Sequence, residues 1–207
     1  EVKRAINILR YFGGEGSRLF SYQIPSERDN VFCFTLRKPL GVVALITPWN
    51  FPTAIPAWKL APALVAGNTV VMKPASLAPL SALRLVQALE QAGLPGGVVN
   101  YVTGSGGALG DAMLEHPSLK AISFTGSCDV GNRLYDKATR RRLRVQLEMG
   151  GKNPTIVLAD ANPDFAAATL VNAAFFSTGQ KCTACSRAIV ERAAYEPFVE
   201  RLIDRKS

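Results

Sequence analysis

The chain has 207 residues, 48% of them hydrophobic, which is enough to bury one substantial core or a domain and a half. Its apolar stretches are too short to cross a bilayer and its start has no signal-peptide pattern, so we expect a cytoplasmic protein with no membrane partner. The net charge of +8 admits nucleic acid or a phosphate-bearing cofactor, while four scattered cysteines and one histidine argue against a disulfide framework and against a bound metal.

The first predicted elements are a helix and two strands. Residues 1–12 carry apolar side chains at the spacing of an amphipathic helix, which Gly13 and Gly14 are expected to end. A polar loop leads to a weakly alternating strand over 31–36. A buried strand over 41–46 follows the turn at Pro39 to Gly41.

Strand and helix then alternate, which is typical of a parallel sheet with crossover helices. The pattern predicts helices over 52–66, 79–92, 109–114 and 130–139, and strands over 68–72, 98–102, 121–124 and 144–147. A strand over 155–158 is expected to continue the same sheet. Asn162 and Pro163 have the pattern of an N-cap and first helical residue for a helix that runs to 176. A strand over 188–190 and a helix over 195–203 complete the series.

The arginines within residues 140–144 are the strongest support for a nucleic-acid partner. The other basic residues are scattered, however, and no aromatic side chains interleave with this run. A solvated connection between a helix and a strand explains the run better. We therefore expect no nucleic-acid partner.

Cys182 is a candidate nucleophile. It follows the Gly179-Gln180 turn, where a helical run breaks, and a thiol on such a break can project into a cleft. Cys185 lies nearer to the start of the next strand, where it can be buried. The alternative is that both cysteines are small apolar fillers.

Glu148 is a candidate general base, because it ends a strand immediately before the flexible Gly150-Gly151 turn. By itself this pattern usually marks a solvated turn residue. With a single histidine in the chain, a base for Cys182 has to be a carboxylate or a water that a carboxylate activates.

Taken together, Glu148-Met149-Gly150-Gly151-Lys152 and Gly179-Gln180-Lys181-Cys182 resemble motifs of the aldehyde dehydrogenase superfamily. The resemblance continues through Pro48-Trp49-Asn50-Phe51-Pro52, Lys73-Pro74-Ala75-Ser76 and Phe124-Thr125-Gly126-Ser127, in the family's order and spacing. It implies an α/β fold, with a Rossmann-like parallel sheet covered by helices on both faces. It also implies a cofactor-binding domain over 1–147 and the start of a catalytic domain over 148–207, truncated in comparison with the family.

The resemblance implies oxidation of an aldehyde to a carboxylic acid with NADP or NAD as hydride acceptor. Cys182 would attack the aldehyde carbon, giving a thiohemiacetal and then a thioester. Asn50 and the backbone N–H of Cys182 would form the oxyanion hole. Glu148 would activate the hydrolytic water. Lys59 matches a family lysine near the path of that proton. An equal alternative is that Lys59 is an ordinary basic residue on a helix face.

For the dinucleotide, the resemblance places Lys73 and Ser76 at the adenosine ribose. A serine at position 76, unlike a glutamate, does not repel a 2′-phosphate, so we expect NADP to be used at least as readily as NAD. The remaining positions implied to bind the cofactor are Trp49, Gly104, Gly126, Ser127 and Met149.

The chain resembles less than half of a typical family member, so we expect it to be catalytically poor or inactive alone. The alternative function is that of a non-catalytic fragment that binds dinucleotide or a partner subunit. An intact parent is expected to be a homo-oligomer. Residues 146–154 and 175–182 are similar to members that oxidise semialdehydes such as 2,5-dioxopentanoate.

Overall fold

The computed structural model describes residues 1–204. The chain divides into two compact units, and the boundary falls between Glu148 and Met149. Each unit is described by itself. Among the described residues, no helix is both long enough and apolar enough to span a membrane.

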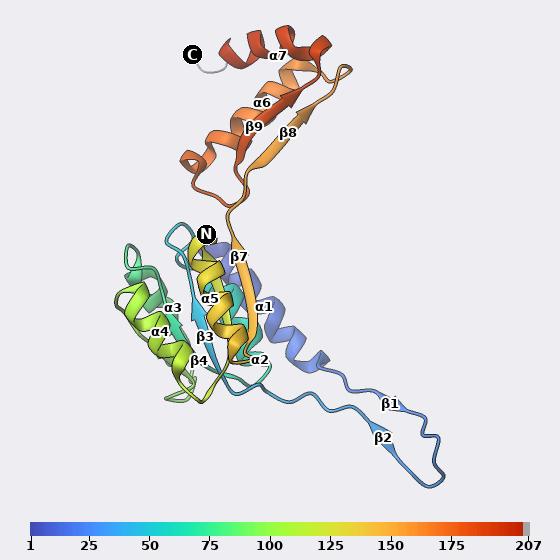
Figure 1. Ribbon diagram of the computed structural model, residues 1–207, viewed down its shortest axis with the longest axis vertical. Coiled ribbons are helices and arrows are strands. Elements are labelled where there is room, and N and C mark those ends of the chain that lie inside the picture. Colours follow the sequence, from blue (N-terminus) through green and yellow to red (C-terminus); the bar gives the residue numbers. More distant parts are fainter. Residues whose placement is uncertain (205–207) are drawn as a thin grey trace. The chain divides into compact units, whose positions relative to one another are not determined.

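A five-stranded sheet forms the centre of the first unit, with strand order β5-β4-β3-β6-β7. Strands β3, β4 and β7 are labelled in Figure 1. Its strands are β3 (Val42–Ile46), β4 (Thr69–Lys73), β5 (Val99–Tyr101), β6 (Leu119–Gly126) and β7 (Arg144–Met149). β3 pairs in parallel with β4 and β6, and β4 pairs in parallel with β5. The continuous apolar run of β3 is typical of a parallel strand that is covered on both faces.

Helices cover both faces of this sheet, as predicted. Val43 and Leu45 of β3 pack with Leu60 of α2 (Ala54–Val65) and Leu85 of α3 (Pro79–Gln91) in one core cluster. The alternate residues, Val42 and Val71, face α4 (Gly106–Glu115) across an apolar cavity of about 310 Å³. α5 (Cys128–Arg140) packs against α4 and β6.

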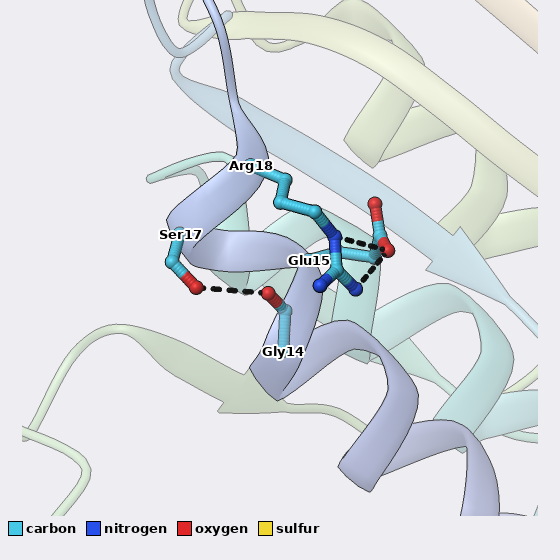
Figure 2. A network of polar contacts seen from close by, with 4 residues as sticks. All are labelled: Gly14, Glu15, Ser17 and Arg18. Atoms are coloured by element: carbon cyan, nitrogen blue, oxygen red, sulfur yellow. Dashed lines mark hydrogen bonds and ion pairs between the residues drawn. The ribbon is translucent and has the colours of Figure 1, made fainter.

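The first helix is longer than predicted. α1 (Val2–Glu15) continues through Gly13 and Gly14, because its apolar face packs on α2 and outweighs the weak helix propensity of two glycines. A short 3₁₀ turn, Gly16–Arg18, follows it. There the Arg18 guanidinium donates two hydrogen bonds to Glu15 Oε1, at 3.0 and 2.5 Å, and Ser17 Oγ donates to the Gly14 carbonyl at 3.0 Å (Figure 2).

The strand predicted over 31–36 is reduced to two residues. β2 (Cys33–Phe34) pairs antiparallel with β1 (Gln23–Ile24), which lies in the segment predicted as a polar loop. Most large apolar side chains of this hairpin are exposed, among them Phe20, Tyr22 and Phe32. A hairpin of two short strands with exposed apolar side chains has little packing to extend its ladder.

The second unit contains β8 (Asn153–Val157), α6 (Pro163–Phe175), β9 (Cys185–Val190) and α7 (Arg192–Asp204). The prediction that the strand near 155–158 continues the large sheet was wrong. β8 pairs in parallel with β9 in a separate two-stranded sheet, because α6 provides the crossover that a parallel pair requires. The predicted N-cap is confirmed, since Asn162 Oδ1 accepts a hydrogen bond from the Phe165 N–H at 3.1 Å.

Candidate active site

One edge of the large sheet collects most of the predicted cofactor residues. Trp49 and Asn50 follow β3, Lys73 ends β4, and Gly126 ends β6. Because these strands are parallel, their carboxyl ends lie on the same side of the sheet, where ligands of such sheets bind. Trp49 is 44% exposed there, so its ring is accessible to a ligand.

Ser76 and Gly104 meet in the loops beyond β4 and β5. Ser76 Oγ donates a hydrogen bond to the Gly104 carbonyl at 3.3 Å. Gly104 has a φ of 153°, which side chains rarely adopt, and a Cβ there would lie 2.8 Å from Leu109 Cδ1, so the position favours glycine. Lys73 is buried, which lowers the pKa of its ammonium group, and its Nζ donates to the Pro74 carbonyl at 3.0 Å.

Gly126 and Ser127 shape the start of α5. A Cβ at Gly126 would lie 2.5 Å from Cζ of the Phe124 ring, so a side chain here would displace that ring. Ser127 caps the helix by accepting a hydrogen bond from the Val130 N–H at 3.4 Å. The glycine thus lets the Phe124 ring pack against the backbone, and the N-terminal amides of the helix that follows are of the kind that favours a phosphate.

The far end of α5 accounts for part of the arginine run. The Arg141 guanidinium donates to the carbonyls of Leu114 and His116, and so ties this connection to the end of α4. At least one of the four arginines in the run therefore has a role within the fold.

Lys59 and Glu148 belong to one polar network on the α2 face of the sheet. Lys59 is only 8% exposed, and its Nζ donates to Ser123 Oγ at 2.7 Å and to Gln146 Oε1 at 3.2 Å. Gln146 Nε2 in turn donates to Glu148 Oε1 at 3.1 Å. Burial lowers the pKa of Lys59 to about 8, and the Glu148 carboxylate opposes that shift.

Ser123 and Gln146 were not predicted as site residues. Ser123 Oγ also donates to Gln146 Oε1, so the amide oxygen accepts from two side chains, Lys59 and Ser123. The alternation of Gln146 and Glu148 along a strand was the available signal, since residues two apart on a strand point to the same face.

Cys182 lies in the second unit, in the segment that follows α6. The helix ends at Phe175, one residue before the predicted end, and the chain turns through Ser177, Thr178 and Gly179, whose φ values are 57°, 54° and 70°. Cys182 is exposed after this turn. Lys181 does not extend freely, because its Nζ lies 4.1 Å from the centroid of the Phe176 ring.

Asn153 holds the cysteine segment in place. Its Nδ2 donates to the carbonyls of Cys182 at 2.7 Å and Ala184 at 3.1 Å. Cys185, by contrast, is half-buried in β9 and its Sγ contacts Thr155 Oγ1 at 3.0 Å. The accessible thiol on the braced loop is therefore that of Cys182.

Comparison with known proteins accounts for this set of motifs. The family model described as "Aldehyde dehydrogenase family" matches residues 1–207. The chain belongs to the aldehyde dehydrogenase family. The Haloferax volcanii alpha-ketoglutarate semialdehyde dehydrogenase is 51% identical to this aldehyde dehydrogenase chain over 205 residues, which are 99% of the chain and 42% of that protein.

Two further relatives show the range of the family. Human retinaldehyde dehydrogenase 3 is 48% identical over 99% of the chain and 40% of its own length. The structure of a Staphylococcus aureus betaine aldehyde dehydrogenase in complex with NAD⁺ matches with a TM-score of 0.95 at 35% identity, over 98% of the chain and 40% of that protein. The chain thus spans about two fifths of the relatives it matches. Within residues 1–204, no cluster of three or more acidic, histidine or cysteine side chains could hold a metal ion.

Proposed function

We propose that this aldehyde dehydrogenase chain supplies the dinucleotide-binding surface and the nucleophile for oxidation of an aldehyde to a carboxylic acid. The observation that carries the proposal is the exposed Cys182, held by Asn153 within the family motif, next to a Cys185 whose thiol is engaged in its strand. The boundary between the two units after Glu148 supports a cofactor-binding domain over 1–147 and the start of a catalytic domain over 148–207.

The residues at the sheet edge fit NADP or NAD. Gly104 and Gly126 let Leu109 and the Phe124 ring pack closely against the backbone at this edge, and α5 directs its capped N-terminus toward the same edge. Trp49, Lys73, Ser76, Ser127 and Met149 are the side chains proposed to complete the site. The bound dinucleotide would accept the hydride that leaves the aldehyde carbon.

The proposed reaction uses three groups of the chain. The Cys182 thiolate adds to the aldehyde carbon, and the oxygen becomes an anion that the Asn50 amide and the Cys182 N–H stabilise. Loss of hydride from the resulting thiohemiacetal leaves a thioester. Glu148 then removes a proton from water, and the hydroxide attacks the thioester, which releases the carboxylic acid and regenerates the thiolate. Lys59 is proposed to lie on the same proton path.

The relatives narrow the substrate only to aldehydes. The Haloferax volcanii relative is named for alpha-ketoglutarate semialdehyde and the human relative for retinaldehyde, yet their identities to this chain differ by only 3 percentage points, 51% against 48%. We propose a semialdehyde, on the motifs over 146–154 and 175–182. We also propose a homo-oligomeric cytoplasmic enzyme, because the β1–β2 hairpin exposes apolar side chains and the cysteines are free.

Thiol labelling tests the proposed function. The chain is treated with iodoacetamide at several pH values, with and without NADP, and Cys182 and Cys185 are read separately by peptide mass spectrometry. We expect Cys182 to react several-fold faster than Cys185 at neutral pH, and the dinucleotide to change its rate. Equal, slow reaction of both thiols with no response to NADP would instead support the alternative of a non-catalytic fragment.

The cofactor preference has its own test at Ser76. Its side chain is exposed, so a glutamate can be accommodated there, and the added charge would repel a 2′-phosphate by roughly 1 to 2 kcal/mol in a solvated site. We therefore expect Ser76→Glu to weaken NADP binding about tenfold and to leave NAD binding within about twofold. Calorimetric titration with both dinucleotides measures this difference.

Ser76→Gln is the matched control, since it has the shape of glutamate without the charge. It should keep most of the affinity for NADP. A preference for NAD in the parent chain that Ser76→Glu leaves unchanged would show that position 76 does not read the 2′-phosphate.

A further inference from the structure

The side-chain amide of Gln146 lies between two charged groups of opposite sign. Its oxygen accepts hydrogen bonds from Lys59 Nζ at 3.2 Å and from Ser123 Oγ. Its nitrogen donates to Glu148 Oε1 at 3.1 Å. With the oxygen held by two donors, the nitrogen has to face the carboxylate, so the network determines which way the amide points.

The fold explains why these groups meet. Ser123 of β6 is in register with Leu45 of β3, and Leu45 packs in the cluster that contains Leu60 of α2, so Ser123 faces α2 and Lys59. β7 is next to β6, and Gln146 and Glu148, two residues apart, point to one face of it. The arrangement thus belongs to regular elements of the first unit.

We propose that Gln146 is a positioning residue that bonds to the Lys59 ammonium and the Glu148 carboxylate at once, and so orients the carboxylate without letting the lysine neutralise it. This inference rests on the proposed role of Glu148 as the general base. A direct Lys59–Glu148 ion pair would occupy the carboxylate that has to take a proton from water. The neutral amide occupies Oε1 through a weaker bond, and the second carboxylate oxygen is the one proposed to meet water.

Other charged groups around α2 have contacts of their own. The Arg4 guanidinium of α1 lies 4.9 Å from the Trp58 ring centroid, and the Glu1 carboxylate accepts hydrogen bonds from the Thr53 and Ala54 N–H groups at the start of α2. Glu148 is the charged group that acts on Lys59 from β7. The network therefore predicts that the Gln146 amide senses the titration of Lys59 through the bond at its oxygen and the presence of the Glu148 carboxylate through the bond at its nitrogen.

The test follows the side-chain amide signal of Gln146 by ¹H–¹⁵N NMR of the chain across pH, assigned by its loss in Gln146→Met. We expect an alkaline step near pH 8 that disappears in Lys59→Met, and a displaced Gln146 signal in Glu148→Gln, which removes the carboxylate that accepts from the amide nitrogen. The amide of Gln91, exposed at the end of α3, is the matched control and should show neither the alkaline step nor the displacement. A Gln146 signal that shows no alkaline step, keeps that step in Lys59→Met, or stays in place in Glu148→Gln overturns the proposal.

A second measurement separates positioning from simple loss of structure. The pH midpoint for acetylation of Lys59, read by mass spectrometry, should fall in Gln146→Met, which removes an acceptor, and rise in Gln146→Glu, which adds a negative charge, by roughly half a pH unit or more each. Shifts of opposite sign cannot come from unfolding, and unchanged midpoints contradict the proposal.

These experiments use no dinucleotide and no aldehyde, so they are independent of the proposed function. If the Cys182 labelling test fails and the Gln146 signal titrates, the proposed function is wrong and the bridging network stands. If the Cys182 labelling test succeeds and the Gln146 signal does not titrate, the role of Gln146 is wrong and the proposed function stands.

Discussion

Phe198→Ala is expected to unfold much of the second unit. Phe198 on α7 is 2% exposed and packs in a small cluster with Val157, Leu170 and two alanines. Truncating a buried phenylalanine costs about 3 to 5 kcal/mol, which a unit of about 60 residues can rarely lose without unfolding. Hydrogen exchange of the amides over 153–204 measures the effect as lost protection.

Phe165→Ala is the matched control for this substitution. Phe165 lies on α6 in the same unit but is 73% exposed, so its removal should change the free energy of unfolding by less than about 0.5 kcal/mol. Equal loss of protection in both variants would contradict the core assignment. Because Asn153 and Cys182 belong to this unit, we also expect Phe198→Ala to remove any difference in labelling between Cys182 and Cys185.

Lys59 is expected to make the stability of the first unit depend on pH between about 8 and 10.5. Burial lowers its pKa from an ordinary 10.5 to about 8, so in this window the unfolded chain binds the proton that the folded chain has released. The free energy of unfolding therefore rises with pH across the window, by up to roughly 3 kcal/mol. Below about pH 8 the cost of burying the ammonium is fully present.

Lys59→Met should remove this pH dependence, so that its stability relative to the parent chain is highest near pH 7 and declines toward pH 10.5. Urea unfolding followed by tryptophan fluorescence measures it, because both tryptophans, Trp49 and Trp58, lie in the first unit. Lys120→Met, at an exposed lysine of β6, is the control and should keep the parent's pH dependence. If the free energy of unfolding changes with pH in the same way in the parent and in Lys59→Met, the pKa of Lys59 is not lowered by burial.

Much of the fold could be predicted because its signals are local. The apolar run of β3, the Asn162-Pro163 helix start and the alternation of strands and helices each depend on neighbouring residues. The errors came from packing between distant segments. α1 passes two glycines because it rests on α2, and β8 leaves the large sheet because β9, some thirty residues later, is its partner.

For the candidate site, the sequence by itself determined the residue types and their order, since Glu148 before two glycines and Cys182 after a glycine turn are local patterns that match one family. The tertiary structure alone decided which groups touch. Lys59 reaches Ser123 and Gln146 across separations of 64 and 87 residues, and Asn153 reaches Cys182 across 29. Such contacts depend on strand order and on which face of the sheet each helix covers. The sequence pattern of a single segment specifies neither the order of the strands nor the face that a helix covers.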